Sequence, residues 1–226
     1  MDEGWLGELA AAVAAAVLAI TLHEAAHGYA ARALGDDTAA RLGRVSLNPL
    51  RHVDPVGTVL VPGFLLVSQL ATTGSVQAMF GWAKPVPVVQ DRLRNPRYGM
   101  VAVAAAGPGI NAVLAFAAAL ALHAATPGGW AFQFLLFAVL ANLLLGLFNL
   151  IPLPPLDGGR IVGGLLPRAM GEPFLRLERL GLLLVILVLF VLPLAVPAWD
   201  PLGVLLREAV WPSMRVVFRL AGHPVS

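Results

Sequence analysis

Long apolar runs joined by short loops dominate the hydrophobic pattern of this chain. The first run extends from Trp5 to Leu34 and is followed by Gly35, a residue type that often ends helices. Two further runs, Gly99 to His123 and Trp130 to Ile151, are separated by the uncharged turn Ala-Thr-Pro-Gly-Gly. About 20 apolar residues suffice for a helix to cross a bilayer. The pattern therefore predicts a membrane helix near the N-terminus and a transmembrane hairpin later in the chain.

Two other apolar segments do not look like simple spans. The segment from Val56 to Phe80 contains Pro62, Gly63 and a polar patch at residues 68–74. A last apolar run, Leu180 to Trp199, precedes a tail in which arginines are separated by apolar residues. We expect this tail to be either an interfacial helix or part of a returning hairpin.

Composition supports a membrane protein independently of this pattern. Hydrophobic residues make up 58% of the chain and charged residues 12%, whereas roughly 25% of residues are charged in soluble domains. We predict an all-α polytopic membrane protein with about four to six membrane segments, including a re-entrant one, and short membrane-adjacent β-strands. No internal repeat or linker divides the sequence, so we expect one membrane-embedded domain over residues 1–226. We expect its core to cover about residues 5–165, and a C-terminal span and amphipathic tail to cover about residues 176–226.

Basic residues in the short loops predict the orientation of the chain. Cytoplasmic loops carry an excess of Lys and Arg. Arg32 lies at the end of the first helix, and Arg41 and Arg44 follow it, whereas acidic residues and no basic signal-peptide region come before it. The N-terminus is then outside, and the first helix is retained. The basic loop from Lys84 to Arg97 obeys the same rule only if the segment from Val56 to Phe80 is re-entrant. Because basic residues are spread over such loops, the net charge of +2 does not indicate nucleic acid as a partner.

The segment His-Glu-Ala-Ala-His at residues 23–27 has the clearest candidate chemistry. It contains the only Asp, Glu, His, Lys or Arg residues between Leu9 and Ala31. Residues four positions apart share one helix face, so His23 and His27 can bind one zinc ion while Glu24 holds the water that zinc activates. Such groups are costly to bury in an apolar span unless a cation compensates. The segment predicts a hydrolytic site with one Zn²⁺ per chain, against the alternative of a polar cluster that packs helices.

A catalytic zinc held by two histidines needs a third protein ligand and an open position for water. The chain has no cysteine, so nitrogen or oxygen must supply that ligand. Asp157 stands out because it follows the span that ends at Ile151, on the side where the charge pattern also places His23 and His27. We therefore predict Asp157 as the third ligand, against the alternative of a carboxylate that caps the following Gly-Gly-Arg turn.

These two sites resemble the site-2 protease family of intramembrane zinc metalloproteases. His-Glu-x-x-His at 23–27 and Asn-x-x-Pro-x-x-x-x-Asp-Gly at 149–158 match the family motifs at every defined position, and Ala-Gly-Pro-Gly-Ile-Asn at 106–111 resembles a recurring stretch. The resemblance covers roughly residues 5–165. The chain has no inserted PDZ domain and no span before the zinc motif, so it is similar to the short prokaryotic type.

The resemblance implies a role for each residue of the two motifs. His23, His27 and Asp157 are the implied zinc ligands, and Glu24 is the implied catalytic base. Asn149 is the implied catalytic-site residue that holds the substrate or the developing oxyanion.

The implied function is that of an intramembrane zinc endopeptidase in regulated intramembrane proteolysis. Its substrates are single-span membrane proteins, cut within or near the bilayer of a prokaryotic cell membrane, with the active site toward the cytoplasm. A substrate helix must unwind before cleavage, and an edge strand at Lys84 to Val89 or at Arg44 to Leu47 is expected to pair with it. Two alternatives remain: a metal-binding or transporter-like membrane protein, which needs no base at Glu24, and a metallohydrolase of a lipid or small molecule.

Three further residues have weaker signals. His52 lies beside Asp54 and is expected either in a structural pair or, less simply, in a direct role at the metal. Gly107 and Gly109 are expected to permit close approach between helices.

Overall fold

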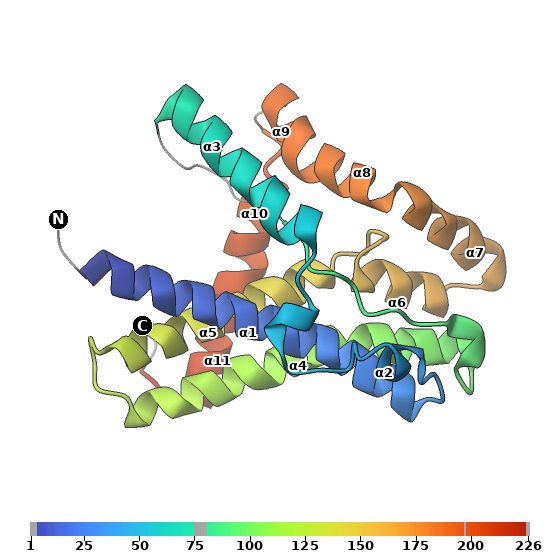
Figure 1. The fold of residues 1–226 in the computed structure, drawn as a ribbon, viewed down its shortest axis with the longest axis horizontal. Coiled ribbons are helices and arrows are strands. Elements are labelled where there is room, and N and C mark those ends of the chain that lie inside the picture. Colours follow the sequence, from blue (N-terminus) through green and yellow to red (C-terminus); the bar gives the residue numbers. More distant parts are fainter. Residues whose placement is uncertain (1–3, 75–80, 197, 225–226) are drawn as a thin grey trace.

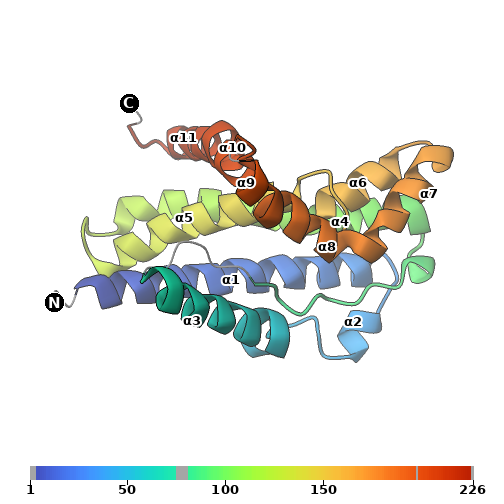
Figure 2. The same cartoon turned by 90° about the horizontal axis from the view of Figure 1, so that it is seen from above.

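Three long helices form the centre of the structure, a computed structural model that describes residues 4–74, 81–196 and 198–224. They are α1 (Gly4–Ala33), α4 (Pro96–Ala121) and α5 (Trp130–Asn149). They pack against one another and run side by side (Figures 1 and 2). The stretches Trp5–Ala33, Pro96–Ala124 and Trp130–Asn149 are long and apolar enough to cross a membrane. The predicted first helix and the predicted hairpin are therefore confirmed as helices of spanning length.

A stripe of small residues lets α1 approach its neighbours closely. Five alanines on this helix are at most 1% exposed, and four of them form one series: Ala11, Ala15, Ala19 and Ala31. They are separated by multiples of four positions, so they form a stripe that winds slowly around the helix. His23 and His27 belong to the same series and are 3% and 9% exposed. The stripe thus carries both histidines into the centre of the three-helix unit.

The hairpin of α4 and α5 begins and turns at residues suited to those positions. The side chain of Asn95 accepts a hydrogen bond from the Tyr98 N–H, and Pro96 occupies the first turn, where no N–H is needed. A short 3₁₀ helix, η4 (Leu122–Ala124), extends α4. Gly128 in the turn has a φ of 78°, a left-handed conformation that glycine adopts without strain.

The segment predicted to be re-entrant leaves the unit and returns to its own starting point. It forms η2 (Pro55–Leu60) and α3 (Val61–Thr73), and α3 extends away from α1 (Figure 1). The return is marked by the hydrogen bond from the Trp82 N–H to the Gly57 carbonyl, at 3.1 Å. The Lys84 N–H likewise donates to the His52 carbonyl, at 2.8 Å. Part of the predicted segment, residues 75–80, lies outside the described residues.

The predicted short β-strands are not confirmed. Within residues 4–74, 81–196 and 198–224 the structure contains helices and no strand. The stretch from Lys84 to Val89 has no regular secondary structure. Its two prolines have no N–H to donate. The Val86 and Val89 N–H groups donate instead to the carboxylates of Glu24, at 3.0 Å, and Asp36, at 2.6 Å.

Asp36 fixes the loop that follows α1. Its carboxylate is fully buried and accepts hydrogen bonds from the Thr38 N–H and hydroxyl and from the Val89 N–H. Burial raises the pKa of Asp36, but the hydrogen bonds from Thr38 and Val89 outweigh it and hold the pKa below its usual value. Asp36 therefore joins the end of α1 to the stretch that crosses Glu24.

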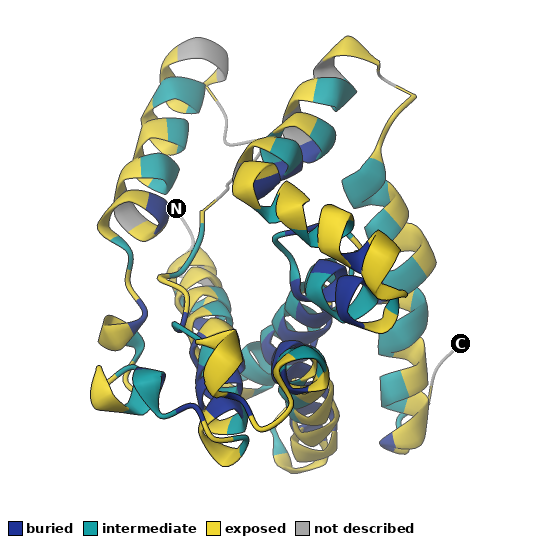
Figure 3. Ribbon diagram, turned by 90° about the vertical axis from the view of Figure 1, so that its right-hand side faces the viewer, coloured by how far each residue is buried: buried dark blue, intermediate teal, exposed yellow. Residues whose placement is uncertain are grey.

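Shorter helices complete the described structure. They are α2 (Thr38–Arg41), η1 (Pro49–Arg51), η3 (Gln90–Arg92), α6 (Asp157–Leu165), α7 (Arg168–Arg176), η5 (Leu177–Leu180), α8 (Gly181–Ile186), η6 (Leu187–Val191), α9 (Leu192–Ala195), α10 (Pro201–Val204), η7 (Leu205–Val210) and α11 (Trp211–Leu220). The elements η7 and α11 pack against α5, and Val210 is fully buried there. The tail is thus part of the packed helical structure, and buried positions gather in the three-helix unit and in α6 (Figure 3). The number of membrane segments beyond three stays a prediction.

Candidate metal centre and active site

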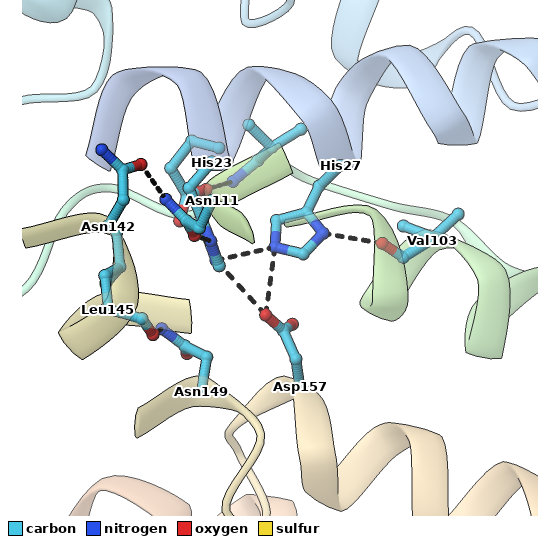
Figure 4. A network of polar contacts seen from close by, with 10 residues as sticks. His23, His27, Val103, Asn111, Asn142, Leu145, Asn149 and Asp157 are labelled. Carbon is cyan, nitrogen blue, oxygen red and sulfur yellow. Dashed lines mark hydrogen bonds and ion pairs between the residues drawn. The ribbon is translucent and has the colours of Figure 1, made fainter. Parts of the chain in front are cut away.

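Asp157 begins α6 and points back toward the two histidines of α1 (Figure 4). The residue is 6% exposed. Two glycines follow it, and each is needed because the backbone comes close. A Cβ atom on Gly158 would collide with the carbonyl of Leu150, and one on Gly159 would collide with the backbone of Pro154. The sequence Asp-Gly-Gly therefore lets α6 begin directly beside the end of α5.

The three side chains meet at one point. His23 Nε2 and His27 Nε2 are 3.1 Å apart. Asp157 Oδ2 is 3.2 Å from His23 Nε2 and 3.3 Å from His27 Nε2. Among the described residues these three form a group whose donor atoms could hold a metal ion. The structure thus brings together the three residues that the sequence predicted as ligands, although residues 27 and 157 are far apart along the chain.

The second nitrogen of each imidazole is held by a partner on α4. His27 Nδ1 lies 2.8 Å from the Val103 carbonyl oxygen. His23 Nδ1 lies 2.5 Å from Asn111 Oδ1. A carbonyl oxygen can only accept, so His27 Nδ1 carries the proton when the ring is neutral. With Nδ1 protonated, the lone pair of Nε2 is left to face the meeting point, which is the usual state of a metal-binding histidine.

The three atoms that meet at this point, the two Nε2 atoms and Asp157 Oδ2, are therefore all hydrogen-bond acceptors, and no hydrogen-bond donor of the described residues lies between them. Asp157 Oδ2 is buried and has no hydrogen-bond donor among the described residues. Three electron-rich atoms at this separation require a positive charge among them, supplied by a metal ion or by a proton.

The separations of the three atoms fit zinc. Zinc binds histidine nitrogen and carboxylate oxygen at about 2.0–2.2 Å in tetrahedral geometry, which sets neighbouring donor atoms about 3.3 Å apart. The observed separations of 3.1, 3.2 and 3.3 Å agree with that value. Two nitrogens and one oxygen are also the donor set of catalytic zinc sites that keep a fourth position for water.

Glu24 lies next to His23 on α1 but takes its hydrogen bond from another segment. The Val86 N–H donates to Glu24 Oε2 at 3.0 Å. Its orientation is therefore set by the stretch from Lys84 to Val89, which crosses α1 above Gly28. A Cβ atom on Gly28 would lie 3.3 Å from Val86 Cγ1 and 2.9 Å from Val45 Cγ2, so glycine allows this close crossing.

Gly107 makes room for the two imidazoles. A Cβ atom at this position would lie 2.5 Å from His27 Nε2 and 2.6 Å from His23 Cε1. At Gly109, two residues further along α4, a Cβ atom would meet nothing within 4 Å. Of the two glycines expected to permit close helix approach, Gly107 lies directly against the candidate ligands.

Two other candidates have local partners. Asn149 Nδ2 donates to the Leu145 carbonyl of its own helix at 3.0 Å, and its role at a substrate stays a prediction. His52 is 3% exposed, and its Nε2 lies 2.8 Å from the Ser46 carbonyl oxygen. Asp54 instead accepts hydrogen bonds from the N–H groups of Val56 and Gly57 at the start of η2. The expected pair of His52 with Asp54 is therefore not found among the described residues; His52 has a structural contact with Ser46 instead.

The hydrogen-bond partners of the two imidazoles and of Glu24 were not predicted from the sequence. Asn111 and Asn142 are 0% and 4% exposed and interact within the membrane-spanning unit. A polar residue inside an apolar span is itself a signal, because it must find a partner there. The Val103 carbonyl and the Val86 N–H belong to the backbone, which leaves no signal in residue type.

Two comparisons with known proteins identify the class of this protein. A family model described as "Peptidase family M50" matches residues 123–192. The chain is 40% identical, over 188 residues, to a protein of Bacillus subtilis (strain 168) named "Putative zinc metalloprotease YwhC"; the match covers 79% of this chain and 78% of that protein. No solved structure matches the chain.

The fold and these similarities define a multi-pass membrane protein of the metalloprotease class. The chain belongs to peptidase family M50, the site-2 proteases.

Proposed function

We propose that this chain is an intramembrane zinc endopeptidase that cleaves membrane proteins within or near the bilayer. One observation carries the proposal: His23, His27 and Asp157 converge inside a unit of three helices of membrane-spanning length. The nitrogen and oxygen donors, their separations and the zinc metalloprotease relative all support Zn²⁺, one per chain, as the cofactor.

Each residue of the site has a distinct task in this proposal. His23, His27 and Asp157 hold the zinc, which when bound lowers the pKa of a water molecule and polarises the scissile carbonyl group. Glu24 accepts the proton of that water and later delivers it to the leaving nitrogen. Asn149 uses one amide hydrogen for the Leu145 carbonyl, and its second is available to a substrate carbonyl.

An apolar hollow beside the zinc motif supports an apolar peptide segment as substrate. A hollow of about 450 Å³ lies between α1 and α4, with walls that include Ala25, Ala26, Ala106 and Gly109. Ala25 and Ala26 are the two residues between Glu24 and His27 in the zinc motif. An unwound stretch of a single-span substrate can lie in such a hollow without exposing its side chains to water.

The proposed topology places the site on the cytoplasmic side of the cell membrane. This requires the segment from Val56 to Phe80 to enter and leave the membrane on one side. The hydrogen bond between Trp82 and Gly57 supports this, because the chain returns to the level at which it left. Three basic loops then share the cytoplasmic side, as the charge rule favours.

Cysteine labelling tests the topology in a chain that has no native thiol. Single cysteines at Arg41, Arg92 and Arg168 should react only with a reagent that reaches the cytoplasmic side. A cysteine at Gly128 should react from outside. Outside labelling at position 92 together with inside labelling at position 41 would make the middle segment a full span and contradict the proposed orientation.

The activity is tested by comparing the parent protein with Glu24→Gln in liposomes that contain single-span membrane proteins. Mass spectrometry should detect new substrate fragments with the parent protein. The rate of cleavage should be about 100-fold to 10,000-fold lower for the variant. Zinc content should be equal in both, because Glu24 is not a proposed ligand. Glu8→Gln, an exposed change on the same helix, should cleave like the parent.

Two outcomes would replace the proposal. Zinc in both proteins without fragments from either would favour a metal-binding protein without hydrolytic activity. Loss of zinc in Glu24→Gln would show that Glu24 is a ligand and not the base.

A further inference from the structure

A chain of buried hydrogen bonds connects His23 to the backbone of α5. Asn111 Oδ1 lies 2.5 Å from His23 Nδ1, and Asn111 Nδ2 donates to Asn142 Oδ1 at 2.8 Å. Asn142 Nδ2 in turn donates to the Ala138 carbonyl at 2.8 Å. The three side chains are at most 4% exposed. Figure 4 shows them in a row from α1 across α4 to α5.

The direction of every hydrogen bond in this row is determined at its far end. The Ala138 carbonyl has no proton and can only accept, so the amide nitrogen of Asn142 must face it. Asn142 Oδ1 then faces Asn111, and only the amide nitrogen of Asn111 can donate to it. Asn111 is thereby required to present Oδ1 to His23.

The state of His23 follows from that orientation. An oxygen opposite Nδ1 requires the proton of the neutral ring to be on Nδ1, which leaves Nε2 with a free lone pair. His27 reaches the same state more simply, because its Nδ1 faces the Val103 carbonyl directly. An isolated Asn111 could turn over and offer a donor, which would move the proton of His23 to Nε2 and remove a ligand.

We propose that Asn111 and Asn142 are positioning residues that fix the tautomer of His23, so that Asn142 controls zinc affinity without touching the metal or the histidines. This inference rests on the proposed zinc site and deepens it. It assigns a different orienting device to each histidine: a backbone carbonyl for His27, and an amide pair for His23.

Zinc affinity in a series of variants tests the proposal. Asn142→Ala leaves Asn111 free to turn over, and the affinity measured by competition with a chelator should fall about 10-fold to 100-fold, the usual effect of losing an outer hydrogen-bond partner. Adding Asn111→Asp should restore most of that loss, because an ionised carboxylate can only accept and again holds the proton on Nδ1. Val139→Ala, a fully buried change on α5 outside the row, should leave the affinity within about threefold of the parent.

If Asn142 has only a structural role, the zinc affinities of the variants should follow a different pattern. Loss of packing at position 142 would not be repaired by a second change at position 111. Failure of the double variant to regain affinity would overturn the proposal, as would an equal loss in Val139→Ala.

Nitrogen NMR of protein labelled with ¹⁵N-histidine reports the tautomer of His23 directly. It requires neither a variant at position 142 nor a measurement of activity. In metal-free parent protein about two pH units above the usual histidine pKa, His23 should show the Nδ1–H form. A His23→Gln variant assigns its signals. An Nε2–H form for His23 would overturn the inference even if zinc binding and cleavage were both observed, so its failure is distinct from that of the proposed function.

Discussion

The chain contains two close pairs of histidines, and their geometry differs in every respect that matters for metal binding. His23 and His27 are nearly perpendicular, with an interplanar angle of 87°, and their Nε2 atoms face each other at 3.1 Å. His123 and His223 are stacked, with an angle of 7° and ring centroids 4.0 Å apart. In the first pair the Nδ1 atoms contact carbonyl oxygens and the Nε2 atoms face each other, whereas in the second each Nε2 contacts a carbonyl oxygen, of Ala221 or Ala119, at 2.7 Å.

Their neighbours differ as well. Asp157 approaches both rings of the first pair within 3.3 Å, while no salt bridge to an acidic residue is found for the second among the described residues. Contacts of the second pair with the carbonyl groups of Ala221 and Ala119 connect the residues after α11 to the end of α4. The comparison shows that proximity of two imidazoles does not make a metal site. The identity of the nitrogen that is tied to the protein and the presence of a third anionic donor decide it.

Removal of the carboxylate should have the largest effect. Asp157→Ala leaves two nitrogen ligands, and zinc affinity should fall more than about 100-fold, beyond the usual loss for an outer partner. Chelator competition followed by metal analysis measures it. Full zinc occupancy in this variant would show that Asp157 caps α6 only and would remove the main difference between the two pairs.

Crowding the first pair should weaken zinc binding without removing a ligand. Gly107→Ala places a methyl group 2.5 Å from His27 Nε2, and the expected loss of affinity is about 10-fold to 100-fold. Gly109→Ala is the matched control, because nothing lies within 4 Å of the added atom. Equal affinities for the two variants would mean that the imidazoles are not held against α4.

A substitution at Asp36, a second buried carboxylate, should change the stability of the protein without changing metal binding. Asp36→Asn replaces one of the two acceptor oxygens with an amide nitrogen, so either Val89 or Thr38 loses its acceptor, and the free energy of unfolding should fall by about 1–3 kcal/mol while zinc affinity is kept. The pKa of Asp36 is below its usual value in the folded protein. Its stabilisation is therefore present above the unfolded pKa and is lost as the pH falls through the folded pKa. Thermal unfolding of parent and variant against pH should converge in acid, and parallel curves would contradict the assignment.

The second histidine pair should show the smallest effect. His123→Ala removes one hydrogen bond and one ring contact, so stability should fall by about 0.5–1.5 kcal/mol, with zinc content unchanged. Thermal unfolding and metal analysis of the same sample measure both quantities. A loss of zinc here would reveal a second site and break the contrast between the pairs.

The sequence predicted the parts of the site that depend on local periodicity. The four-residue spacing of His23 and His27 placed both on one helix face, and the structure buries both residues. The charge pattern and the ligand requirement together selected Asp157, and the structure brings it to the histidines. The helix and the hairpin of spanning length follow from apolar run length alone.

The rest depended on contacts between distant segments. An edge strand was predicted at Lys84 to Val89, but the Val86 and Val89 N–H groups that a strand partner would need donate to Glu24 and Asp36. The partners of the imidazoles, Val103 and Asn111, are set by how α4 packs on α1. Such packing is encoded in surface shape and not in any short motif.

X-ray absorption at the zinc edge of the purified protein tests the central claim most directly. The account predicts one zinc per chain with four nitrogen or oxygen neighbours at about 2.0 Å and outer-shell scattering from two imidazole rings. A spectrum with one imidazole or none, or one that loses its imidazole scattering in His123→Ala, would contradict the assignment of zinc to His23, His27 and Asp157.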